Sequence, residues 1–342
     1  MHPHGEYGQL VTRRQFFGRA SSGIGIAALS ALLGTRPANA ANGVLGTNHL
    51  APKAKRVIYL FQSGGPSQME LFDYKPTLER FHGEDLPPSI RQGQRLTTMT
   101  SGQDKLPVAA SKFAFRPCGQ SGLQFSELVP HIGEMADDIC VIRSMHTEAI
   151  NHDPGMTMMQ TGSQQPGRPS FGAWMSYGLG SENENLPGFV VLVSHGSSRR
   201  PAQPLRQNLW GASFLPSEHQ GVTLRPTGDP VLYLNNPPGV NDTARRRMLD
   251  TVAALNSAQY GEFANPEIQA RIVQYELAYR MQFSVPELTD ISVEPESVLN
   301  LYGPNVRQRG TYAANCLLAR RMAERGVRFI QLYHRGWDHH GD

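Results

Sequence analysis

The sequence predicts an α/β protein in which helices are layered around a mainly parallel sheet. Three observations predict this class. Short apolar, β-rich runs recur along the chain, segments with helical spacing lie between them, and 34 glycines and 25 prolines indicate many turns. At 342 residues, the chain is long enough to bury a large core in one or two domains.

Four apolar runs predict the strands. The first starts with two charged residues and becomes continuously apolar before a Gly-Gly-Pro turn. Because such runs lack polar alternation, they indicate strands that are buried on both faces. The predicted strands are residues 55–61, 139–143, 188–194 and 327–333.

Helices are predicted between these runs, and the last helix is the clearest. Residues 310–325 repeat apolar side chains at helical spacing, and Gly326 provides a C-terminal stop. Residues 266–281 begin with a proline in the first turn, where no backbone amide is needed. The other predicted helices are residues 125–135, 154–161, 170–177 and 243–255, and residues 85–120 and 195–240 predict loops.

The charge distribution excludes one class of function. Residues 1–40 contain four arginines and one glutamate, which account for the whole net charge of +3. The rest of the chain is therefore electrically balanced. A nucleic-acid-binding protein normally has a basic excess that displaces counterions, so no nucleic-acid partner is expected.

The first forty residues have the order of a secretory signal. A twin arginine followed by two aromatic residues lies at 13–17, an apolar stretch at 24–33, and a small-x-small cleavage site at 38–40. The apolar stretch is too short to span a bilayer. We therefore predict a signal for the twin-arginine export machinery and a periplasmic or extracellular mature domain over residues 41–342. The alternative is a stray arginine pair beside a buried helix.

Ligands of open α/β sheets bind beyond the carboxyl ends of the strands, and three polar segments are predicted there. The first contains Ser63, Gly64 and Gly65, which follow the opening strand. A Gly-Gly turn of this kind can cradle an anion, but it is also an ordinary way to make a turn.

The second segment contains His146, Asn151 and His152 and is followed by a predicted helix that starts near Pro154. A helix start offers unpaired amides and the positive end of the helix dipole, which suit phosphate or sulfate. In the alternative interpretation, Asn151 and Asp153 only cap that helix.

The third segment, residues 334–342, is the most metal-like. Asp338 and His340 are two residues apart, so in an extended segment both side chains point to one side and can share a divalent ion. A solvated terminal loop is the alternative. Asp73 is a further possible ligand, with a structural role as its alternative.

Together these motifs identify a family resemblance. The chain from about Arg56 resembles the bacterial exported family known as domain of unknown function 1501. That family is similar to the alkaline phosphatase and sulfatase superfamily. The resemblance implies a three-layer α/β/α fold and hydrolysis of phosphate or sulfate esters with a divalent metal such as zinc, calcium or manganese. Its motifs are Ser63-Gly64-Gly65-Pro66-Ser67, Phe72-Asp73-Tyr74, Arg143-Ser144-Met145-His146, Asn151-His152 and Gly336-Trp337-Asp338.

The resemblance also implies which residue occupies the nucleophile position and where the domain ends. Sulfatases carry their nucleophile two residues before a helix-start proline and a Thr-Gly pair after it. Pro154 and Thr161-Gly162 match this frame, which places His152 at the nucleophile position. The family continues beyond its Trp-Asp-x-His motif, so the resemblance implies that the domain is truncated and incomplete at its C-terminus.

The expected function is an exported metal-dependent hydrolase of a small anionic ester or of a sulfated or phosphorylated glycan. The alternative is an exported binding protein that keeps the fold without catalysis. In the hydrolase, His152 acts as nucleophile or ligand, and Asn151 orients the transferred group. The expected substrate-binding residues are Ser63, Gly64, Gly65 and His146, and the expected metal ligands are Asp338, His340 and Asp73.

Overall fold

The computed structural model describes residues 43–46, 50–91, 97, 100–196, 204–232 and 234–338. The predicted signal in residues 1–40 and the predicted ligand His340 lie outside these residues. Within the described ranges, no helix has both the length and the apolar character needed to cross a bilayer.

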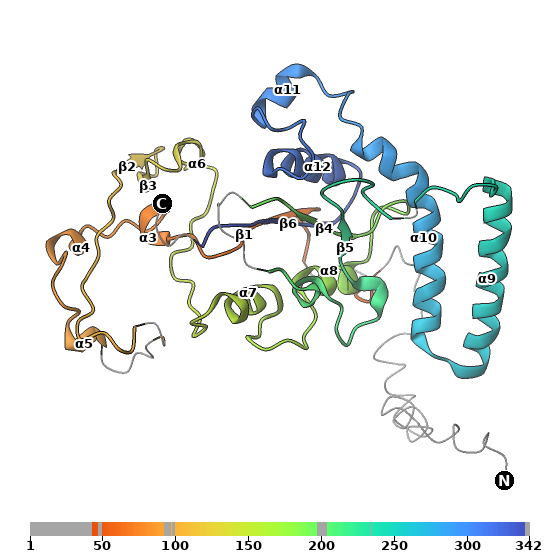
Figure 1. Cartoon of the computed structure of the whole chain (residues 1–342), viewed down its shortest axis with the longest axis horizontal. Coiled ribbons are helices and arrows are strands. Elements are labelled where there is room, and N and C mark those ends of the chain that lie inside the picture. The colour runs from red at the N-terminus through yellow and green to blue at the C-terminus, as the bar shows by residue number, and fades with distance from the viewer. Residues whose placement is uncertain are drawn as a thin grey trace, which may run out of the picture.

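A four-stranded, fully parallel sheet forms the centre of the described chain (Figure 1). Its order is β1-β6-β4-β5, so strands from opposite ends of the sequence are neighbours. This arrangement confirms the predicted α/β class with a mainly parallel sheet. The strands are β1 Val57–Gln62, β4 Phe189–Val193, β5 Val222–Leu224 and β6 Phe329–His334.

Helices cover both faces of this sheet (Figure 1). On one face, α10 (Pro266–Thr289) and α12 (Tyr312–Glu324) pack against Ile330 and Leu332 of β6. On the other face, Met156 of α7 (His152–Thr161) packs in one cluster with Phe329 and Tyr333. The helix α8 (Phe171–Leu179) covers the same face, where Phe171 contacts Phe329 edge-to-face. Alternate residues of β6 thus face opposite helical layers, as the pleat of a strand requires.

The predicted helices near the sheet are confirmed, and their ends have local causes. Asn151, Ser170 and Thr311 occupy the N-cap positions of α7, α8 and α12 with side-chain acceptors. The helix α9 (Asp242–Phe263) and α10 both extend well beyond their predicted ends. They form an antiparallel pair at one end of the molecule (Figure 1).

Two predictions for residues 123–143 are wrong. Residues 125–135 do not form one helix, because a hairpin of β2 (Phe115–Cys118) and β3 (Leu123–Ser126) precedes a short helix α6 (Pro130–Glu134). Residues 139–143 do not form a strand. Ile139 and Val141 pack against the hairpin and α6, whereas Ile142 is 64% exposed. The short apolar run reflected a local cluster, which periodicity alone does not distinguish from a strand.

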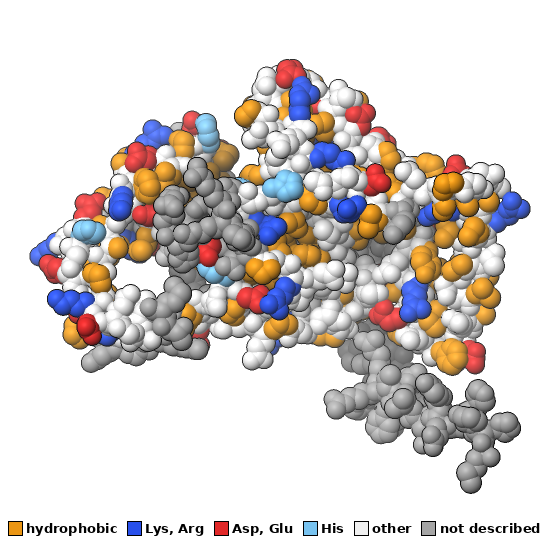
Figure 2. Space-filling model, in the orientation of Figure 1, with side chains coloured by type: hydrophobic (Ala, Val, Ile, Leu, Met, Phe, Trp, Pro, Cys, Tyr) orange, Lys and Arg blue, Asp and Glu red, His pale blue; other side chains and the backbone are white. Residues whose placement is uncertain are grey.

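The remaining short elements lie in the loop-rich segments. Basic and acidic side chains are interspersed over the visible face of the molecule, in keeping with the balanced charge of residues 41–342 (Figure 2). These elements are α3 Gln68–Leu71, α4 Thr77–Arg80, α5 Pro88–Arg91, α11 Glu296–Leu301 and the 3-10 turns η3 Gln207–Trp210 and η4 Ser217–His219.

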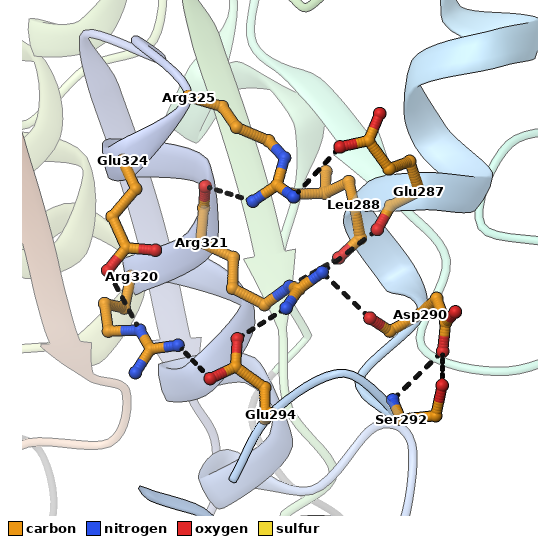
Figure 3. A network of polar contacts seen from close by, with 9 residues as sticks. All are labelled: Glu287, Leu288, Asp290, Ser292, Glu294, Arg320, Arg321, Glu324 and Arg325. Carbon is orange, nitrogen blue, oxygen red and sulfur yellow. Dashed lines mark hydrogen bonds and ion pairs between the residues drawn. The ribbon is translucent and has the colours of Figure 1, made fainter.

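A buried arginine joins the two helices of one layer (Figure 3). Arg321 of α12 is 3% exposed and donates hydrogen bonds to the carbonyl oxygens of Glu287, Leu288 and Asp290, at distances of 2.8–3.0 Å. These oxygens lie at the C-terminal end of α10, where carbonyls lack helical partners. Arg321 also pairs with Glu294, so the charge is compensated where it is buried.

Candidate functional site

The carboxyl ends of β1 and β6 are tied together by their backbones. The amide of Ser63 donates to the carbonyl of His334 at 2.8 Å, and the amide of Trp337 donates to the carbonyl of Ser63 at 3.0 Å. Backbone hydrogen bonds between the two chain segments therefore continue past the last residues of β1 and β6. It holds the segment after β1 against the segment that carries Asp338.

Gly64 makes this close approach possible. Its φ is +117°, and a Cβ atom at this position would lie 2.4 Å from the backbone nitrogen of Asp338. Backbone atoms cannot move aside as the end of a flexible side chain can, so only glycine fits here. Gly65 lies next to His152, since a Cβ atom at Gly65 would lie 3.8 Å from Nδ1 of His152.

His152 and Asp338 meet at this edge of the sheet. Nε2 of His152 lies 3.3 Å from Oδ1 of Asp338, and their side chains are 32% and 27% exposed. The pair is therefore reachable from solvent but partly shielded. The three positions that the sequence predicted at one rim, residues 63, 152 and 338, lie together there.

The N-terminus of α7, which is the positive end of the helix dipole, lies next to the His152–Asp338 pair. His152 is the first residue of the helix, and Oδ1 of Asn151 accepts a hydrogen bond from its amide at 2.7 Å. Arg206 lies beside the same first turn, 3.8 Å from the carboxylate of Asp153, with 68% of its side chain exposed. The helix end and the exposed guanidinium both favour an anionic ligand.

The hydroxyl of Ser63 points away from the pair. Ser63 is fully buried, and its Oγ donates to the sulfur of Met156 at 3.5 Å inside the core. This residue therefore contributes its backbone to the site geometry, while its side chain packs under α7.

Two other predicted site residues lie elsewhere. His146 is exposed and lines an apolar cavity of about 490 Å³ with Met158, Thr161 and Trp174, toward the C-terminal end of α7. Asp73 pairs with Lys75 at 2.9 Å. Across the residues that the structure describes, no group of three or more His, Cys, Asp or Glu side chains is arranged to hold a metal ion. Asp73 thus does not join His152 and Asp338.

His334 anchors the loop that carries Asp338, a role that sequence reasoning missed. Its ring stacks on Tyr312 of α12 with centroids 4.3 Å apart, and its Nδ1 accepts a hydrogen bond from the indole of Trp337 at 3.2 Å. Burial lowers the pKa of His334, so the ring is held neutral as a hydrogen-bond acceptor. The available signal was a histidine at the strand end with a tryptophan three residues later.

The geometry of the pair suits two chemical roles. Two donors that bind one tetrahedral zinc at about 2.0–2.1 Å lie about 3.4 Å apart, close to the observed separation. One imidazole nitrogen and one carboxylate oxygen are therefore placed as two adjacent ligands of a divalent ion. Without an ion, the same pair places an imidazole base within ion-pair distance of a carboxylate.

Comparison with known proteins identifies a family but no described relative. Neither the curated proteins nor the solved structures contain a match to the chain. A family model described as "Protein of unknown function (DUF1501)" matches residues 54–342, a range that includes Ser63, Gly64, His152 and Asp338. The chain therefore belongs to the DUF1501 family.

Proposed function

We propose that the protein is an exported, metal-dependent hydrolase of phosphate or sulfate esters, with an alkaline phosphatase-like arrangement of sheet and site. The observation that carries the proposal is the 3.3 Å approach of His152 and Asp338 at the carboxyl edge of a parallel sheet, in front of a helix N-terminus. This is the place where open α/β sheets bind ligands.

The donor set fits a divalent ion such as zinc, manganese or calcium. Nε2 of His152 and Oδ1 of Asp338 would hold it, and a nitrogen with an oxygen donor favours zinc. When bound, such an ion polarises the ester and offsets the negative charge that develops during hydrolysis. Because a histidine nucleophile would use the same Nε2 atom, we assign His152 as a ligand and water as the attacking group.

The residues of the chain bind and orient the anionic ester. The positive end of the α7 dipole and the guanidinium of Arg206 attract its charged oxygens. The Gly64-Gly65 turn has no side chains, which leaves room beside His152 for the ester group. Water then adds across the P–O or S–O bond, and the products are an alcohol and phosphate or sulfate.

Hydrolysis assays with matched variants test the proposal. The full-length exported protein is assayed with an aryl phosphate and an aryl sulfate, with zinc, manganese or calcium added. We expect H152A and D338N each to reduce kcat/KM by about a hundredfold or more. H131A is the control, because the side chain of His131 is 90% exposed on α6. Unchanged hydrolysis by H152A would contradict the proposed role.

The second candidate function is a non-catalytic, exported binding protein. It is favoured by the buried hydroxyl of Ser63, which leaves no hydroxyl nucleophile at that position, and by the small ligand set within the described part of the chain. In this case the start of α7 binds a phosphorylated or sulfated glycan without turnover. Saturable binding of glucose 6-phosphate, with no phosphate released in the presence of zinc, would favour this function over the first.

A further inference from the structure

A second cavity lies at the opposite edge of the sheet from His152 and Asp338. It has a volume of about 570 Å³ and is bounded by the C-terminal end of α8, by α10 and by residues 180–188, which lead into the first residue of β4. Because all four strands are parallel, this is the amino edge of the sheet. Its size is in the range of small-molecule sites.

Three polar side chains converge at one wall of this cavity. Oγ of Ser176 lies 3.1 Å from Nδ1 of His219, and Nε2 of His219 lies 3.6 Å from Oε1 of Glu218. The ring of Tyr177 contacts His219 edge-to-face. Burial lowers the pKa of His219 to about 4, so near neutral pH the imidazole carries no charge that could compensate Glu218.

Glu218 differs from the other carboxylates around the cavity. Glu276 pairs with Arg246 and Arg280, and Glu184 pairs with Arg280 at the rim. Among the described residues, no lysine or arginine pairs with Glu218, whose side chain is only 24% exposed. Burial and the nearby carboxylate of Glu267 both raise the pKa of Glu218, which indicates that its negative charge is poorly compensated.

One part of the remaining lining is apolar and consists of Leu186 and Pro187 before β4 and Ile272, Val273 and Leu277 on α10. The guanidinium of Arg280 also lines the cavity, but it is paired with Glu184 and Glu276. An uncompensated carboxylate beside an apolar wall suits a cation that is attached to an apolar body.

We propose that this cavity binds a small organic amine. Its ammonium group contacts the carboxylate of Glu218, and its carbon skeleton lies against Leu186 and Leu277. The hydroxyl of Ser176 and the neutral imidazole of His219 provide further hydrogen-bonding atoms beside the ammonium. The site is separate from the proposed hydrolytic site and does not depend on that function.

Calorimetric titration of the full chain with benzylamine tests the proposal. Benzyl alcohol, which has the same shape without the charge, is the ligand control. We expect saturable benzylamine binding that E218Q weakens about tenfold or more, because a charged hydrogen bond is lost. E134Q is the protein control, since Glu134 is 69% exposed on α6 and does not line the cavity, and its dissociation constant should stay within about twofold of the wild-type value.

Three results would overturn the proposal. They are an absence of saturable benzylamine binding to the wild-type chain, equal affinity of E218Q and the wild type, and equal affinity for benzyl alcohol and benzylamine. Thermal melting of E218Q shows whether the variant is folded. Should it fail to fold, pairwise comparison of benzylamine with benzyl alcohol on the wild-type chain still decides the outcome.

Discussion

The buried cluster around Arg321 and the partly exposed pair of His152 and Asp338 treat charged groups in opposite ways. Around Arg321, a guanidinium that is 3% exposed meets three backbone carbonyls and the carboxylate of Glu294 (Figure 3). At the carboxyl edge, His152 and Asp338 remain about one-third exposed, and their closest atoms are 3.3 Å apart. The first cluster is closed to ligands, whereas the second is open to them.

The difference shows how a structural cluster can be separated from a candidate site. Burying a charge is costly unless its hydrogen-bonding groups are satisfied, so a structural arginine is surrounded by acceptors. A binding site must keep some bonding capacity for its ligand. By this criterion, Arg321 stabilises the packing of α12 on α10, while the partly exposed His152–Asp338 pair is the candidate site. Four predictions test this comparison.

The largest effect is expected at the closed cluster. R321M should lower the free energy of unfolding by about 3–5 kcal/mol, because Glu294 and three carbonyl oxygens lose a buried donor. R307M is the control, since Arg307 and its partner Glu296 are 55% and 67% exposed, and it should cost about 1 kcal/mol or less. Urea unfolding measures both values. A loss below about 1 kcal/mol for R321M would remove the distinction between the clusters.

The second prediction concerns the close backbone approach at the open cluster. G64A should cost about 3 kcal/mol, because the new Cβ meets the backbone of Asp338 and alanine disfavours a φ of +117°. G65A is the matched control. Its Cβ has no neighbour nearer than 3.8 Å, so only the backbone strain of about 1 kcal/mol remains. Equal unfolding midpoints for the two variants would show that residues 63–64 do not pack against the Asp338 segment.

A pH effect is expected from His219, a partly buried residue of the cavity at the amino edge of the sheet. Its pKa is near 4 in the folded chain and near 6.5 when unfolded, so between these values only the unfolded chain binds the proton. Stability therefore falls as pH decreases through this window, by about 2 kcal/mol between about pH 7 and pH 5. H219N should remove this component. A wild-type stability curve parallel to that of H219N over this range would contradict the burial of a neutral imidazole.

The smallest effect is expected at the anchor of the Asp338 loop. W337F removes the indole donor to Nδ1 of His334 and should cost about 1 kcal/mol. W174F is the control, because Trp174 is 44% exposed and its indole has no such role. If both variants unfold at the same denaturant concentration, the Trp337–His334 bond does not stabilise the loop.

Local signals explain why most of the central elements were predictable. The strand β6 and the helix α12 are close to their predicted ranges, because apolar periodicity and the Gly326 stop act within a few residues. The strand β5 was missed, since three residues carry too short a pattern. The strand predicted at residues 139–143 was wrong because an apolar run shows that a segment is buried but does not identify the element it packs against.

The candidate site was predictable in location but not in detail. The rule that ligands bind at strand carboxyl ends placed residues 63, 152 and 338 at one rim. It could not show that the hydroxyl of Ser63 turns into the core toward Met156, or that Asp73 pairs with Lys75. The first outcome depends on the packing of α7 against the end of β1, and the second on an ion pair between side chains two residues apart.

By itself, the sequence determined the α/β class, the central strands and the segments that carry polar chemistry, because these follow from short-range periodicity, capping and turn residues. Only the tertiary structure decided which polar groups meet. The parallel pairing of β1 with β6 places Gly64 against Asp338, and the packing of α7 on the sheet brings His152 to within 3.3 Å of Asp338. Contacts between residues so far apart in the chain depend on strand order and backbone packing, which no local pattern specifies.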